Sequence, residues 1–292
     1  MTNSLSGKTA ILGIGAQKAG TTWLFNYLNA CRVLACSPLK EMHFFDARCR
    51  RDLCGGFDTR SFETALQNLN SMANINAIRS NSMLQARIDR IQMIFSSAAY
   101  LDHFRRITPP EVNHFCEITP SYSLLRTDGF EFIKSMMGSN GIKVKFIMLL
   151  RDPVERHWSH VRFQQNQSSH FDAKRDFVET LEQPGFLERT RYDLTIQNLM
   201  SVFGREDVYF EFYERMFDSG RLERLMTFLG LPFHKPDLAR RKNVSAEIGG
   251  LRDSDRLLAI SKYKSVYDFC HEFFHGQLPN TWLKHMAMPS DA

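Results

Sequence analysis

The sequence predicts an α/β fold of three layers, with a mostly parallel central sheet and helices on both faces. Short apolar runs typical of buried strands alternate with segments whose apolar residues recur at helical spacing. The run at 143–150, Lys-Val-Lys-Phe-Ile-Met-Leu-Leu, is the strongest strand and suits a central position. We find no repeat or convincing linker, so we expect one domain over residues 1–292, with a helical subregion at about 55–108.

The first strand, at 9–14, leads into a glycine loop suited to an anion. The loop is Gly-Ala-Gln-Lys-Ala-Gly-Thr-Thr-Trp at 15–23, and a helical run follows at 24–28. Backbone N–H groups of such a loop and the helix N-terminus both favour a phosphate. The arrangement is P-loop-like, but a triphosphate P-loop has lysine directly after its second glycine, where this chain has Thr21. Because Lys18 lies inside the loop instead, the site suits a 5′-phosphate without magnesium.

The stretch Gln-Lys-Ala-Gly-Thr-Thr-Trp-Leu at 17–24 resembles the 5′-phosphosulfate loop of sulfotransferases that use 3′-phosphoadenylyl sulfate (PAPS). The resemblance implies that Lys18 is catalytic, because it would neutralise charge that builds on the bridging oxygen and the 5′-phosphate. It also implies that the loop binds the cofactor through Lys18, Ala19, Gly20, Thr21, Thr22 and Trp23.

A second strand, at 33–36, precedes a loop dense in titratable groups. The loop reads Lys-Glu-Met-His-Phe-Phe-Asp at 40–46, and it is similar to the segment that carries the catalytic glutamate in heparan-sulfate-type sulfotransferases. The match implies that Glu41 is the base, with Lys40, His43 and Asp46 beside it in the site. His43 is the alternative base, since its ordinary pKa of about 6.5 suits the role better than that of a solvated carboxylate.

The middle of the chain predicts helices and then a third strand. Amphipathic helices at 62–69 and 83–104 would either form a wall of an acceptor pocket or be purely structural. The strand at 112–116 leads into Glu-Ile-Thr-Pro-Ser-Tyr, which resembles a family segment with lysine where this chain has Ile118. On this match we place Tyr122 at the acceptor, and the missing lysine suggests an acceptor less anionic than heparan sulfate.

The strand at 143–150 ends at a second candidate anion site. Asp152 is a good N-cap for the helix that follows, and Pro153 takes its first position. Arg151 and Ser159 provide a permanent charge and a hydroxyl for a terminal phosphate, and they resemble the family's 3′-phosphate motif. The histidines at 157 and 160 have a spacing that could bind a metal, but we expect ordinary helix-surface or acceptor-side residues and no metal site.

The C-terminal third predicts helices at 176–181, 186–203 and 222–229, a strand at 208–212, and a last helix at 257–274. We expect little organisation after residue 279. A basic loop at 240–245 is similar to the family loop that closes over the cofactor, and the resemblance implies contacts to its 3′-phosphate from Arg241, Lys242 and Asn243.

Composition narrows the choice of partners. The net charge of +5 suits an anionic ligand, while the absence of a dense basic and aromatic run disfavours nucleic acid. No apolar stretch approaches the ~20 residues of a membrane helix, and the polar N-terminus is unlike a signal peptide, so we expect a cytoplasmic protein. The six cysteines lack a standard zinc spacing, which predicts free thiols.

The resemblance therefore implies transfer of a sulfuryl group from PAPS to a hydroxyl or amine of a carbohydrate, lipid or small metabolite. The resemblance covers about residues 9–250. Two alternatives stay open: a P-loop kinase that acts on a small molecule, and a non-catalytic nucleotide-binding module. The kinase would need an acidic residue that binds magnesium, a position that Asp152 could imitate. The non-catalytic module would function without Glu41 and His43.

Overall fold

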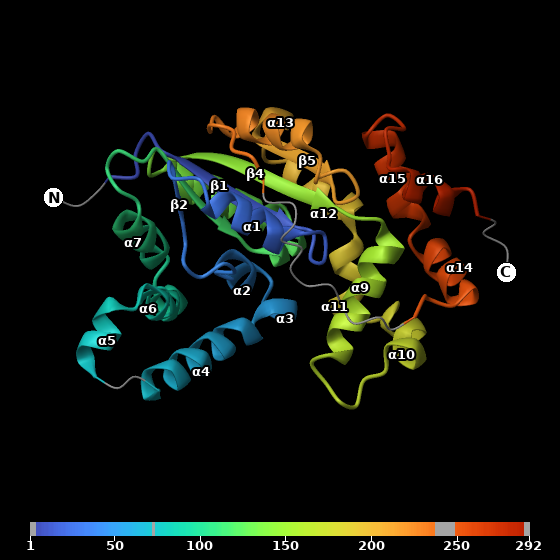
Figure 1. Cartoon of the computed structure of the whole chain (residues 1–292), viewed down its shortest axis with the longest axis horizontal. Coiled ribbons are helices and arrows are strands. Elements are labelled where there is room, and N and C mark those ends of the chain that lie inside the picture. The colour runs from blue at the N-terminus through green and yellow to red at the C-terminus, as the bar shows by residue number, and fades with distance from the viewer. Residues whose placement is uncertain (1–3, 72–73, 237–248, 289–292) are drawn as a thin grey trace.

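The computed structural model describes residues 4–71, 74–236 and 249–288. Its centre is a five-stranded parallel sheet in the order β2-β3-β1-β4-β5, as Figure 1 shows. The order places the first strand between β3 and β4, and the predicted α/β fold with a mostly parallel sheet is confirmed. The strands are β1 (Thr9–Gly15), β2 (Leu34–Cys36), β3 (His114–Ile118), β4 (Lys143–Leu150) and β5 (Val208–Phe212).

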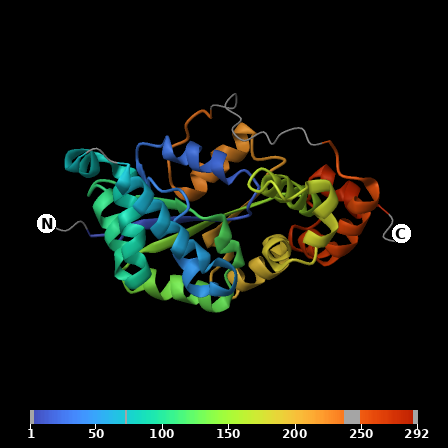
Figure 2. The ribbon, with the colours of Figure 1, turned by 90° about the horizontal axis from the view of Figure 1, so that it is seen from below.

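Helices cover both faces of the sheet. Helices α1 and α13 lie on one face and α8 and α12 on the other, as the view from below shows (Figure 2). The helices are α1 (Thr21–Asn29), α2 (Phe45–Cys49), α3 (Arg51–Cys54), α4 (Gly56–Asn70), α5 (Ile75–Ser80), α6 (Ser82–Phe95), α7 (Ala98–Ile107), α8 (Thr127–Gly138), α9 (Pro153–Gln165), α10 (Ala173–Thr180), α11 (Pro184–Leu187), α12 (Tyr192–Met200), α13 (Ser219–Leu229), α14 (Asp253–Lys262), α15 (Lys264–Phe273) and α16 (Asn280–Met286).

The third strand extends two residues beyond its expected end at 116, so Glu117 and Ile118 belong to β3. Ile118 pairs with Gly13 of β1, and a Cβ at Gly13 would come within 2.8 Å of the Ile118 side chain. The isoleucine that replaces the family's lysine is therefore a fully buried sheet residue, packed where its neighbour leaves room.

The helix expected at 83–104 divides into α6, which ends at Phe95, and α7, which begins at Ala98. Two further expected helices are each broken in two. The helix predicted at 186–203 is interrupted by a 3₁₀ turn at Glu188–Thr190, where the buried Arg189 turns inward and donates a hydrogen bond to Ser121 Oγ. The helix predicted at 257–274 breaks at Tyr263, whose side chain is buried and hydrogen-bonded to His157. In both cases a long-range side-chain contact overrides a local helical pattern.

The expectation of little organisation after residue 279 was wrong. Helix α16 forms there, and its Trp282 is fully buried against Tyr192, Phe212 and Tyr267. Indole burial of this size stabilises a short helix that its own sequence would not. Among the described residues, none of the helices is both long and apolar enough to cross a membrane.

Candidate active site

The loop after β1 turns sharply to bring its backbone to the start of α1. Gly20 has a left-handed backbone with φ 84° and forms the N-cap of α1, and Lys18 is also left-handed at φ 71°. A Cβ at Gly20 would lie 2.9 Å from Met216 Sδ and 3.0 Å from Tyr213 Cδ2, so both conformation and space require glycine. Ala19 and Thr21 are buried, and Thr21 is the first helical residue. The N-terminus of α1 is therefore available to an anion, as the motif predicts.

The side chain of Lys18 lies in a cationic and partly buried environment. Its ammonium sits over the ring of Phe163, 4.3 Å from the centroid, and Arg151 Nη1 donates to the Lys18 carbonyl at 3.1 Å. Burial and then the positive charges of Arg151, Arg162 and Arg156 lower the pKa of Lys18 to about 8. The structure thus brings together the two sites that the sequence places 133 residues apart.

We call Lys18, Arg151, Arg156 and Arg162 the donor-side cations. Within the described parts of the chain none of the four forms a salt bridge. Arg156 is fully buried. Among the described residues, its Nε and Nη1 and the Nε of Arg162 have no hydrogen-bond partner. Buried positive charge without an acidic partner is costly, and an anionic ligand would offset that cost.

Helix α9 carries the rest of the predicted second anion site. Ser159 lies three residues from Arg156 and from Arg162, so all three occupy one face of the helix. The charges of the two arginines lower the pKa of Lys18. The Tyr192 hydroxyl donates to the Arg151 carbonyl at 2.9 Å and fixes the end of β4. Ser159 itself is buried, at 4% exposed.

The Asp152 carboxylate is occupied by structural contacts. One oxygen accepts from the Glu155 N–H at 3.0 Å, as expected of an N-cap, and the other accepts from Tyr267 and from His285, both at 2.9 Å. The group is fully buried. These contacts leave no role for Asp152 as the magnesium ligand of a kinase.

The two histidines of α9 are buried, so the helix-surface alternative was wrong, and an acceptor-side position stays a prediction. His157 lies between Thr180 and Tyr263, at 2.8 and 2.6 Å, and burial lowers its pKa well below the ordinary value. His160 packs against the ring of Phe186, 4.4 Å between centroids. Burial, and then the charges of Arg156 and Arg189, lower the pKa of His160 in the same way.

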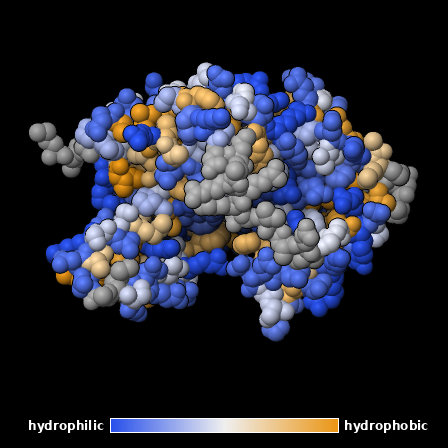
Figure 3. Space-filling model, in the orientation of Figure 1, coloured by the Kyte–Doolittle hydropathy of each residue, from blue (hydrophilic) through white to orange (hydrophobic). Residues whose placement is uncertain are grey.

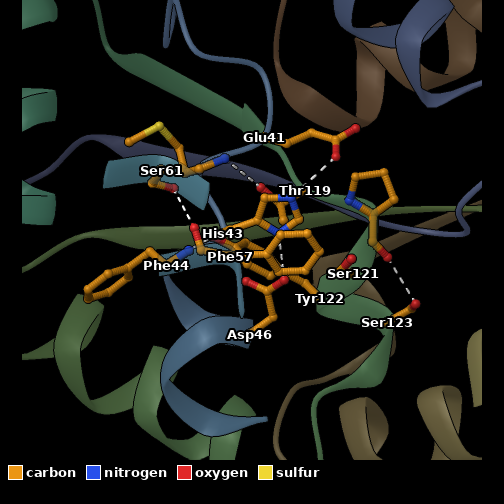
Figure 4. A network of polar contacts seen from close by, with 12 residues as sticks. Glu41, His43, Phe44, Asp46, Phe57, Ser61, Thr119, Ser121, Tyr122 and Ser123 are labelled. Carbon is orange, nitrogen blue, oxygen red and sulfur yellow. Dashed lines mark hydrogen bonds and ion pairs between the residues drawn. The ribbon is translucent and has the colours of Figure 1, made fainter. Parts of the chain in front are cut away.

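The loop after β2 forms a linear arrangement of three titratable groups. The His43 ring lies between Glu41 and Asp46 and stacks on Phe57 of α4, with 3.6 Å between ring centroids (Figure 4). Its Nδ1 donates to Asp46 Oδ2 at 2.7 Å, and its Nε2 lies 3.4 Å from Glu41 Oε2. Lys40 contacts the other oxygen of Glu41. The Glu41 side chain is 41% exposed, against 12% for His43, so Glu41 is the member that faces outward.

These contacts move the pKa values of His43 and Glu41 in opposite directions. Burial alone would lower the pKa of His43, but the hydrogen bonds to Asp46 and Glu41 and their charges raise it to about 8. Burial likewise would raise the pKa of Glu41, yet His43 and Lys40 lower it to about 2. Near neutral pH the pair therefore holds one proton, on the imidazole.

The remaining predicted site residues fall into three groups. Asp46 and Tyr122 are both fully buried, and the Tyr122 hydroxyl contacts Glu117 at 3.0 Å, so acceptor contact by either stays a prediction. Thr22 and Trp23 are partly exposed in the first turn of α1, with Trp23 stacked on Tyr27. The remaining three candidates lie outside the described residues: Arg241, Lys242 and Asn243.

Sequence reasoning missed several residues that surround the site. Arg156 and Arg162 could have been found from their three-residue spacing about Ser159. Arg189 had no such signal: it reaches the site from the break before α12, where Glu41 and Asp46 act on it electrostatically. The surface is hollowed between the part formed by α4–α6 and the part formed by α10 and α11, and apolar surface lies at the inner end (Figure 3).

Comparison with known proteins decides the family. A model described as "Sulfotransferase family" matches residues 10–235. The chain belongs to the sulfotransferase family. A sulfotransferase from Alicyclobacillus acidocaldarius has a similar fold, with a TM-score of 0.60 and 16% identity over 94% of this chain and 99% of that one. No curated protein sequence matches.

Two further sulfotransferase structures align over most of this chain. The sulfotransferase domain from the curacin biosynthetic pathway has a TM-score of 0.45 and 16% identity, over 97% of this chain and 96% of that one. Sulfotransferase STF9 from Mycobacterium avium has a TM-score of 0.46 and 13% identity, over 90% of this chain and 76% of that one.

Proposed function

We propose that this sulfotransferase uses PAPS as donor and transfers the sulfuryl group to a hydroxyl or amine of a carbohydrate, lipid or small metabolite. The observation that carries the donor assignment is the group of donor-side cations, which form no salt bridge among the described residues and whose arginines act electrostatically on Lys18, two residues before the N-cap of α1. PAPS carries negative charge on two phosphate positions and on a sulfate. This negative charge would pair with the guanidinium groups of Arg156 and Arg162, which have nitrogens without a hydrogen-bond partner in the described structure.

Two groups of residues would bind the two ends of the donor. The loop at 15–20 and the first turn of α1 would hold the 5′-phosphosulfate, with Lys18 against the bridging oxygen. Arg151 and Ser159 would hold the 3′-phosphate. PAPS supplies an activated sulfuryl group, whose transfer breaks the bond between sulfur and the 5′-phosphate and forms a bond between sulfur and the acceptor atom. In-line transfer of this kind depends mainly on positioning and on charge stabilisation.

The exposed carboxylate of Glu41 meets the acceptor and takes its proton. A carboxylate with a pKa of about 2 is a weak base on its own. Its contact with His43 makes the pair a stronger base. Once the imidazole is neutral, the proton that Glu41 takes from the acceptor can pass to His43 Nε2, which lies 3.4 Å from Glu41 Oε2. Asp46, fully buried, holds Nδ1 and stabilises the imidazolium that forms. The strong base is then the pair, with an apparent pKa near that of His43, about 8.

Calorimetry with the product nucleotide, 3′-phosphoadenosine 5′-phosphate, tests the donor assignment. We expect it to bind more tightly than ADP or ATP with magnesium. Arg151→Ala should weaken its binding roughly 100-fold, because truncating one partner of a buried charged contact costs ~2–5 kcal/mol and ~1.4 kcal/mol is tenfold.

ADP lacks the 3′-phosphate, so its affinity should change little in Arg151→Ala. The matched control is Arg224→Ala, an exposed arginine on α13, which should leave both affinities unchanged. A preference for ATP with magnesium would overturn the proposal in favour of the kinase. Product binding without turnover of any acceptor would favour the non-catalytic module.

A further inference from the structure

The backbone at His43 is held in an unfavourable conformation. Its φ is 49°, in the left-handed region that residues other than glycine rarely adopt. Such a conformation persists only where the surroundings fix it. The structure shows what fixes it on both sides of the loop at 42–44.

Arg90 of α6 binds the carbonyl groups of the loop. Its guanidinium donates from Nη2 to the His43 carbonyl at 2.8 Å and from Nε to the Met42 carbonyl. It also contacts Asp58 of α4, which neutralises it. Arg90 is 1% exposed, so water does not compete for these bonds. A planar fork of N–H donors can satisfy two neighbouring carbonyls together, which a lysine ammonium does less well.

A network centred on Glu117 binds the N–H groups of the same loop. The Met42 N–H donates to Thr119 Oγ1 at 3.0 Å, and the Phe44 N–H donates to the Tyr122 hydroxyl at 3.3 Å (Figure 4). Both hydroxyls donate in turn to the buried carboxylate of Glu117, which also accepts from Tyr100 at 2.6 Å. The peptide groups on either side of His43 are thus bonded from two directions.

We propose that Arg90 is a positioning residue of the active site: by binding the Met42 and His43 carbonyls opposite the Glu117 network, it keeps the imidazole between Glu41 and Asp46. The part that this imidazole plays in catalysis rests on the proposed function, but its position does not. The inference gives the helical subregion at about 55–108 a role, since its helix α6 supplies the guanidinium and α4 supplies both Asp58 and the stacked Phe57.

The pKa of His43 reports its position without any acceptor. The charged groups around the ring are Lys40 and Glu41 on its own loop, Asp46 on α2, and Asp58 with Arg90. The sign separates two effects. Removing the positive charge of Arg90 would by itself raise the pKa of His43, whereas releasing the ring from Glu41 and Asp46 would lower it.

The experiment is an NMR titration of the histidine ring protons in the full chain, with His43 assigned by loss of its signal in His43→Gln. For Arg90→Met we expect the pKa of His43 to fall from about 8 toward the ordinary 6.5. Arg87→Met is the matched control: Arg87 lies on the same helix, and its guanidinium makes no hydrogen bond to the loop in the described structure, so the pKa should stay near 8.

Arg90→Lys guards against simple unfolding, because it keeps the charge and the apolar stem. We expect a folded protein with an intermediate pKa at His43. A pKa that stays at or above the wild-type value in either folded Arg90 variant overturns the proposal, as does failure of Arg90→Lys to fold, which would make Arg90 a folding residue. Binding of 3′-phosphoadenosine 5′-phosphate, measured on the same samples, tests the proposed function separately. If wild type does not bind this nucleotide, the proposed function fails, but the pKa of His43 still tests the role of Arg90.

Discussion

The two halves of the site treat charge in opposite ways. On the donor side, burial and then the positive charges of three arginines lower the pKa of Lys18 to about 8. On the acceptor side, Lys40, Glu41, His43 and Asp46 pair within seven residues of sequence, and the loop that carries them is held by hydrogen bonds from two directions.

The difference indicates how each half depends on a ligand. The acceptor side is neutralised and positioned by the protein itself, as catalytic groups need to be. The donor side forms no salt bridge with the described residues, and a bound anion or counterions from solution would offset its charge. The predictions below test whether the two halves behave this independently.

The largest effect is expected from Glu41→Gln. Loss of the group that takes the acceptor proton should lower kcat by ~10²–10⁴. The affinity for 3′-phosphoadenosine 5′-phosphate should change little, since the donor-side cations are untouched. Transfer from PAPS in a panel of hydroxyl and amine acceptors, with Glu63→Gln as an exposed control on α4, measures this. Equal losses of rate and product affinity would show that the halves are coupled.

Salt should act on the donor side alone. Because its cations have no acidic partner in the described chain, we expect product affinity to fall on the order of tenfold from low to about 0.5 M ionic strength. The pKa of His43, held by short contacts in a partly buried site, should change far less over the same range. Calorimetry and histidine NMR at matched salt concentrations measure the two. A pKa at His43 that follows the affinity would contradict the contrast.

The pH dependence of turnover should change in Asp46→Asn. In wild type the pair must lose the imidazole proton to act as base, so kcat should rise with pH through about 8. Removing the Asp46 charge lowers the pKa of His43, and the rising limb should move to lower pH. A kcat profile of both proteins measures the shift. A limb that moves to higher pH would rule out His43 as the proton store.

The smallest effect concerns protons taken up on binding. Above its pKa of about 8, Lys18 is mostly neutral in the free protein, and a bound phosphate favours its charged form. Product binding at about pH 9 should therefore take up a fraction of a proton and weaken as pH rises. Calorimetry in buffers of different ionisation enthalpy measures it. Lys18→Met should abolish the uptake, and uptake that persists there would assign it to another group.

The sequence predicts the fold well because its signals are local, and the donor-side prediction rests on local signals of the same kind. The loop at 15–23 and the start of α9 are each contiguous, and the parallel sheet brings the ends of β1 and β4 together by rule. The acceptor loop was also predicted, but not what holds it. Arg90 and Glu117 lie 47 and 74 residues from the His43 region, and no pattern in either segment shows that they point toward it.

The failures have the same physical cause. Tyr263 and Arg189 break helices that local periodicity extends, because each side chain finds a buried partner far away in sequence. The histidines of α9 were misplaced for the related reason that elements from the C-terminal third cover this helix. A single sequence carries no direct record of such contacts.

Helix α16 shows that the folded unit extends past the region that the family model matches. The match ends at residue 235, yet Trp282 Nε1 donates to Glu214 at 3.2 Å and His285 donates to Asp152, next to Arg151. Ending the chain at residue 235 would expose the Asp152 carboxylate and the apolar neighbours of Trp282 to water. The end of the family match is therefore not a safe place to cut this protein, because contacts from beyond it fix the end of β4.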